Sequence, residues 1–126
     1  MLLYTETVIK GIETGRMTYL AHPDVLYYTG CDLDLYRECA RRIIRAAMGR
    51  NLPLEINLLG IGEKREYPRL EFWQEVGSLG AKAIIGVDAH EPVRVLNRDE
   101  LAAARRLAER CGVELLDKLD LVNPFA

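Results

Sequence analysis

The chain has 126 residues, 49% of them apolar, which suits one domain built around one hydrophobic core. The net charge is −2, with acidic and basic residues interspersed, so no field of one sign favours a nucleic acid or a membrane surface as partner. The apolar runs are too short to span a bilayer and the amino terminus lacks a signal-peptide pattern, so we expect a cytoplasmic protein.

Two helices are expected in the first half of the chain. Apolar residues recur at helical spacing over residues 3–14, and Gly15 follows where a left-handed cap belongs. A second helix should begin at an N-cap, Asp32 or Asp34, because apolar residues then recur at every fourth position. Its arginines favour the negative end of the helix, and it should end near Met48.

Short strands are expected between the helices. Runs of strand-forming residues cover 17–21, 52–59 and 82–87, and a weaker one covers 113–116. Residues 25–31 are expected to be irregular.

Two further helices follow in the second half. Pro68 suits the first position of a helix that Gly80 ends. Asn97, with Glu100 three residues later, resembles a capping box at the start of a helix that Gly112 closes.

This alternation of strands and helices predicts an α/β protein with a parallel sheet and right-handed crossovers. Ligand sites in such folds lie at the carboxyl ends of the strands. His22 directly follows the first strand, and Asp88 and His90 follow the third, so both histidines of the chain lie at strand ends. Residues two apart in an extended chain point the same way, so Asp88 and His90 can reach one bound ion.

The residue types at these strand ends are those of a metal site. Two imidazoles with one or two carboxylates suit zinc, manganese or iron, with a coordination position left open for water or a phosphate oxygen. Such an ion lowers the pKa of bound water and neutralises charge on a phosphoryl group. The spacing alone also fits two unrelated histidines, each satisfied by local hydrogen bonds.

Polar residues in the second strand and the loop after it bear on the same site. Glu55 and Asn57 share one face of the strand, which is either open to water or aimed at a site. Because apolar strands flank this one in a parallel sheet, the pattern favours a site. The loop 62–66 that follows is a run of charges, typical of solvated surface.

Four motifs, taken in order, resemble the PHP family of phosphoesterases, in particular its histidinol-phosphatase branch. The motifs are Leu20-Ala21-His22-Pro23-Asp24, Leu54-Glu55-Ile56-Asn57, Arg65-Glu66-Tyr67-Pro68 and Ile85-Gly86-Val87-Asp88-Ala89-His90. The resemblance implies a distorted (β/α)7 barrel, a cluster of divalent metal ions, usually three, and hydrolysis of a phosphorylated small molecule.

The resemblance also implies a role for each matching residue. These are the metal ligands His22, Asp88 and His90, the last two also catalytic, the phosphate-binding Arg65, and the site-lining Glu55 and Asn57.

The sequence also departs from the family pattern. A complete member begins with a strand carrying His-x-His, followed by further His and Glu ligands, and this chain has neither. Residues 1–126 therefore resemble a single, partial domain, the carboxyl-terminal half of the barrel. Its uncovered sheet face and edge predict self-association, or pairing with a separate amino-terminal half. Two functions stay open: a phosphomonoester hydrolase that is active when completed, and a non-catalytic metal- or phosphate-binding remnant or oligomeric scaffold.

Overall fold

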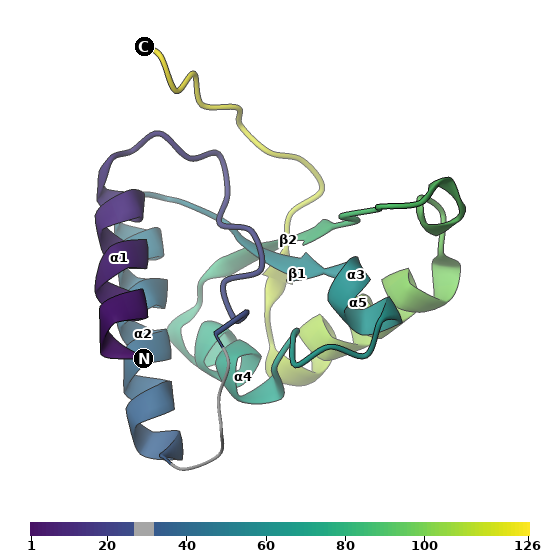
Figure 1. The fold of residues 1–126 in the computed structure, drawn as a ribbon, viewed down its shortest axis with the longest axis horizontal. Coiled ribbons are helices and arrows are strands. Elements are labelled where there is room, and N and C mark those ends of the chain that lie inside the picture. Colours follow the sequence, from purple (N-terminus) through teal and green to yellow (C-terminus); the bar gives the residue numbers. More distant parts are fainter. Residues whose placement is uncertain (27–31) are drawn as a thin grey trace.

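The computed structural model describes residues 1–26 and 32–126, and places a small parallel sheet against a row of helices (Figure 1). The helices are α1 (Leu2–Glu13), α2 (Leu33–Gly49), α3 (Leu58–Gly62), α4 (Leu70–Leu79) and α5 (Arg98–Cys111), with a short 3-10 turn, η1 (Pro92–Arg94). The strands are β1 (Leu54–Asn57), β2 (Lys82–Gly86) and β3 (Glu114–Leu115). The described residues thus combine helices with a parallel sheet, which is compatible with the predicted α/β class, while the (β/α)7 barrel stays a prediction.

The sheet has the order β1-β2-β3, and both strand pairs are parallel. In its register Asn57, the last residue of β1, lies opposite Gly86, the last residue of β2. Leu20 extends the sheet by one parallel bridge to Leu54, with hydrogen bonds of 2.9 Å to the Pro53 carbonyl and 3.0 Å from the Glu55 amide. The expected strand over residues 17–21 is therefore reduced to one bridge, because the chain turns at His22, whose φ is 29°.

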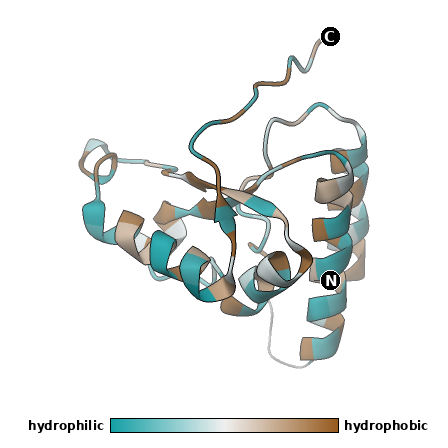
Figure 2. Ribbon diagram, turned by 180° about the vertical axis from the view of Figure 1, so that it is seen from behind, coloured by the Kyte–Doolittle hydropathy of each residue, from teal (hydrophilic) through white to brown (hydrophobic). Residues whose placement is uncertain are grey.

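The helices pack side by side in the order α1, α2, α4, α5, with α3 against α5. Side chains of α2, α4 and α5 form the core with one face of the sheet, which carries Leu54, Ile56 and Ala83. Figure 2 shows hydrophilic and hydrophobic residues alternating along the helices, as expected for helices with one buried face. By strand alternation, Glu55 and Asn57 point to the opposite face.

The predicted caps explain why the longer helices begin and end where they do. Asp32, rather than Asp34, caps α2, its side chain accepting from the Leu35 amide at 2.8 Å. Asn97 caps α5 by accepting from the amides of Asp99 and Glu100. The reciprocal half of the expected capping box is not seen, because the Glu100 carboxylate accepts from Arg94 instead, at 3.2 Å.

Two element boundaries differ from the prediction. The strand expected over 52–59 ends at Asn57, because the Asn57 side chain accepts from the Gly60 amide at 2.9 Å and so caps the five-residue helix α3. Pro68 does not occupy the first helical position, since α4 begins at Leu70 with Arg69 as its N-cap residue.

The remaining predictions concern short segments. The strand expected over 82–87 ends at Gly86, and the one expected over 113–116 is reduced to the two residues of β3. The irregular stretch expected at 25–31 falls mostly outside the described residues. No helix in the described ranges has the length and apolar character needed to cross a membrane.

Candidate functional site at the carboxyl ends of the strands

The predicted site residues gather where β1 and β2 end. His22 lies two residues beyond the Leu20 bridge, Asn57 ends β1, and Asp88 lies two residues beyond the end of β2. In a parallel sheet these positions all lie at the carboxyl ends of the strands, where ligands bind in α/β folds.

Glu55 and Asn57 form the buried centre of this cluster, with only 3% and 1% of their surfaces exposed. Oε2 of Glu55 accepts from the backbone amide of His22 at 2.8 Å and from Nδ2 of Asn57 at 3.2 Å. The same Nδ2 donates to Oδ2 of Asp88 at 3.1 Å. This face of β1 is therefore closed to water, and its polar groups join the two loops that carry the predicted ligands.

Asp88 and His90 lie together, although not for the reason the sequence suggested. Asp88 has left the strand with a φ of 46°, so the two residues are not neighbours on one face of an extended chain. Nε2 of His90 nevertheless lies 3.2 Å from Oδ1 of Asp88, with the His90 side chain largely exposed. The turn at Asp88 brings the two side chains together.

The ligand atoms of this cluster, imidazole nitrogens and carboxylate oxygens, are of the types that bind divalent ions. Two ligand atoms bound at about 2.0 to 2.1 Å to one tetrahedral ion lie about 3.3 Å apart, close to the Asp88–His90 separation. Nδ1 of His22 is buried and has no hydrogen-bond partner among the described residues, which leaves it available as a ligand. Within residues 1–26 and 32–126 there is no group of three His, Cys, Asp or Glu side chains placed to hold one ion. A cation shared by His22, Asp88 and His90 therefore stays a prediction.

Arg65 lies beside the cluster rather than in it. Its guanidinium pairs with the Glu63 carboxylate at 2.5 Å and donates to the Tyr67 hydroxyl at 3.1 Å. The bond to Glu63, more than that to Tyr67, raises the pKa of Arg65. The Tyr67 ring in turn lies 5.6 Å from that of His22, measured between centroids. The Tyr67 ring thus lies between Arg65 and His22, and the charge of Arg65 is paired with that of Glu63.

Asp24 supports the site structurally, although its sequence context predicted no role for it. Its buried carboxylate accepts from the Arg69 amide at 2.6 Å and from the Trp73 indole at 2.9 Å. Burial raises the pKa of Asp24 to about 6, although these hydrogen bonds oppose the shift. Trp73 offered a signal, because a buried indole N–H needs an acceptor.

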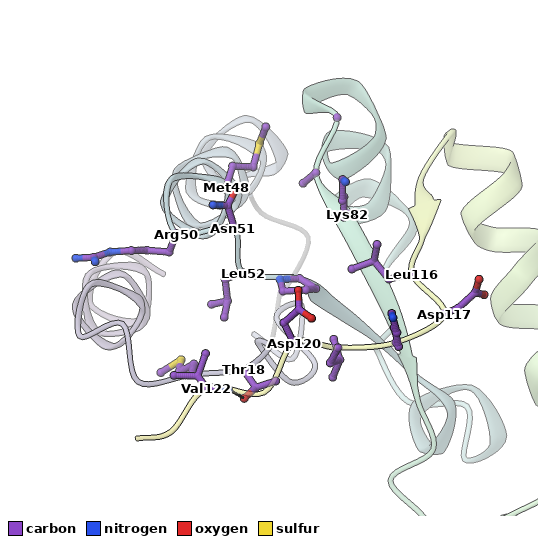
Figure 3. A pocket seen from close by; sticks show the side chains of 16 residues that line it. Thr18, Met48, Arg50, Asn51, Leu52, Lys82, Leu116, Asp117, Asp120 and Val122 are labelled. Atoms are coloured by element: carbon purple, nitrogen blue, oxygen red, sulfur yellow. Dashed lines mark hydrogen bonds between the residues drawn. The ribbon is translucent and has the colours of Figure 1, made fainter. Parts of the chain in front are cut away.

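A cavity of about 820 Å³ lies elsewhere, between the end of α2, the start of β2 and the chain after β3 (Figure 3). Figure 3 labels side chains from all three segments, among them Met48, Lys82 and Asp120. None of the predicted site residues lines it. It adjoins the start of β2, whereas ligands of parallel sheets bind at the carboxyl ends of the strands.

Comparison with protein-family models, with curated proteins and with solved structures found no match to this chain. The interpretation of the site therefore depends on its own residues and geometry.

Proposed function

We propose that the carboxyl ends of β1 and β2 form a metal-dependent site for a phosphorylated small molecule. The activity proposed is that of a phosphomonoester hydrolase of the PHP type, most similar to histidinol-phosphate phosphatase. The observation that carries the proposal is the Asp88–His90 pair, joined through Asn57 and Glu55 to the turn at His22.

In this proposal each residue has one task. His22, Asp88 and His90 bind a zinc, manganese or iron ion, and Arg65 holds the phosphate oxygens by charge-assisted hydrogen bonds. When bound, such an ion offsets the negative charge that develops on the phosphoryl oxygens. Glu55 and Asn57 line the site and keep water from its inner wall.

A second function, metal or phosphate binding without turnover, is favoured by the small number of ligands. Asp88 and His90 are the pair of predicted ligands that lie within 3.2 Å of each other, and two protein ligands make a weak site. We propose that a second copy of the chain, or a separate amino-terminal half of a PHP barrel, supplies the remaining ligands.

Metal binding and turnover separate these functions. Calorimetry should detect Mn²⁺ or Zn²⁺ binding to the wild-type chain. Asp88→Asn and His90→Ala each remove a proposed ligand, so each should weaken binding by more than the roughly tenfold cost of losing an outer hydrogen-bond partner. Asp117→Asn, an exposed acid outside the cluster, is the matched control and should bind as the wild type does.

Release of phosphate from histidinol phosphate by the metal-loaded chain would support the hydrolase. Binding without release would support the remnant. Failure of the wild-type chain to bind either metal, or binding that both site variants leave unchanged, would reject the proposed site.

A further inference from the structure

Glu55 and Asn57 are polar side chains buried on a strand, and each makes bonds that reach beyond its own segment. Buried polar groups need partners, and these partners come from three other places in the chain. They are the His22 amide, the Asp88 carboxylate and the Gly60 amide.

The bond to His22 supports an unfavourable backbone conformation. His22 has a φ of 29°, in the left-handed region that residues other than glycine seldom adopt. Its amide donates to a carboxylate at 2.8 Å, and such charge-assisted bonds are among the stronger ones in proteins. Glu55 therefore holds the turn that presents the His22 imidazole.

Asp88 is held in the same way from the other strand. It too has a positive φ, 46°, and its Oδ2 accepts from Nδ2 of Asn57. The orientation of this amide is fixed, because Oδ1 of Asn57 accepts from the Gly60 amide and leaves the nitrogen facing the two carboxylates. One NH₂ group thus bridges Glu55 and Asp88.

The neighbouring strand leaves room for this arrangement. A Cβ atom on Gly86 would lie 1.8 Å from Oε1 of Glu55, so only glycine fits opposite Asn57 while Glu55 keeps its place.

We propose that Glu55 and Asn57 are positioning residues that set the His22 turn and the Asp88 carboxylate relative to each other. A change at either residue then moves both loops. The inference rests on the proposed function only in treating His22 and Asp88 as metal ligands. The coupling of their two loops through Glu55 and Asn57 is a property of the metal-free chain.

The test uses two substitutions of nearly unchanged size. Glu55→Gln removes the charge that holds the His22 amide. Asn57→Asp keeps an oxygen for the Gly60 amide but replaces the bridging donor by a third carboxylate oxygen. Asn97→Asp is the matched control, because Asn97 caps α5 in the same manner and its side-chain oxygen accepts from two backbone amides.

Amide hydrogen exchange and chemical shifts in the metal-free protein provide the first measurement. We expect the protection of the His22 amide to fall about tenfold in Glu55→Gln, as for loss of one charge-assisted hydrogen bond. Asn57→Asp should shift both the His22 and Asp88 resonances, and Asn97→Asp should shift neither. A His22 amide unchanged in Glu55→Gln, or an Asp88 signal unchanged in a folded Asn57→Asp protein, would overturn the proposal. If Asn57→Asp does not fold, the His22 amide in Glu55→Gln decides alone.

Mn²⁺ affinity provides the second measurement and separates the two proposals. If the wild-type chain binds Mn²⁺, we expect Glu55→Gln to weaken binding about tenfold, the usual effect of losing an outer hydrogen bond that positions a ligand. If the wild-type chain binds none, the proposed function fails, while the metal-free spectra still decide whether Glu55 and Asn57 couple the two loops.

Discussion

Trp73 and Asp24 are joined by a hydrogen bond of 2.9 Å in the core, from the indole nitrogen to Oδ2 of the carboxylate. The same oxygen accepts from the Arg69 amide, so one buried acid ties the turn after His22 to the start of α4. Its other oxygen is buried without a hydrogen-bond partner among the described residues. The carboxylate is therefore a structural anchor that is costly to keep ionised.

The first prediction concerns the pH dependence of stability. Because burial raises the pKa of Asp24 from its ordinary 3.8 to about 6, the folded state holds a proton that the unfolded state releases between these values. The contribution of Asp24 to the free energy of unfolding should therefore fall as the pH rises from about 4 to 6, by about 2 to 3 kcal/mol in all.

Asp24→Asn should remove this dependence and keep an oxygen for the Trp73 and Arg69 donors. Urea unfolding at several pH values measures it, with the exposed Asp117→Asn as control. A variant less stable than the wild type at pH 7.5, with an unchanged pH profile, would contradict the assignment.

The second prediction concerns Arg65 and its neighbour Glu63. Glu63→Gln should release the guanidinium from its carboxylate partner and strengthen phosphate binding in the presence of Mn²⁺ about threefold, a small effect because exposed ion pairs are weak. Glu66→Gln, a neighbouring exposed acid that pairs with Arg69, is the control. Calorimetry with inorganic phosphate measures both. Equal affinities for Glu63→Gln and the wild type would indicate that Arg65 does not hold the anion.

The third prediction concerns the close approach of Gly86 on β2 to the Glu55 side chain on β1. Gly86→Ala should lower the free energy of unfolding by about 1 to 3 kcal/mol, the usual cost of overpacking, because the new methyl group meets the Glu55 carboxylate. Gly49→Ala is the control, since no other side chain lies within 4 Å of its Cβ position. In a double-mutant cycle, Glu55→Ala should relieve part of the loss caused by Gly86→Ala. Strictly additive losses would show that the two positions do not interact.

The fourth prediction concerns association. Both faces of β1 are buried, but apolar side chains just beyond His90 are exposed, with 79% of the surface of Val93 and 87% of that of Leu96 accessible. We therefore expect reversible self-association in sedimentation velocity over a wide range of concentration. A folded monomer at every concentration would count against both self-association and the need for a second copy.

The sequence predicted the longer helices well because their signals are local. The N-cap at Asp32, the N-cap at Asn97 and the left-handed Gly112 each act within one helical turn, so they can be recognised without tertiary structure. Helix α3 was missed because five residues are too few to show a period, and because Asn57 ends the strand through its side chain.

For the site, the sequence predicted the location but not the contacts. The carboxyl ends of parallel strands lie on the same side of the sheet, and this rule alone places His22 and Asp88 in the same region. The left-handed turn at Asp88, the Glu63 partner of Arg65 and the anchoring role of Asp24 depend on backbone conformation and on side-chain packing. Residue spacing carries no signal for these.

The bonds that assemble the cluster join residues far apart along the chain, 33 positions from His22 to Glu55 and 31 from Asn57 to Asp88. During synthesis, a chain that has emerged from the ribosome only as far as Asn57 contains both partners of the first bond but only one partner of the second. Until β2 emerges from the ribosome and docks, Asn57 lacks its Asp88 partner, and the bond between them must also offset the entropy of closing the chain between them. The cluster is thus completed late in biosynthesis, and a proteolytic cut between residues 57 and 88 would separate its two loops.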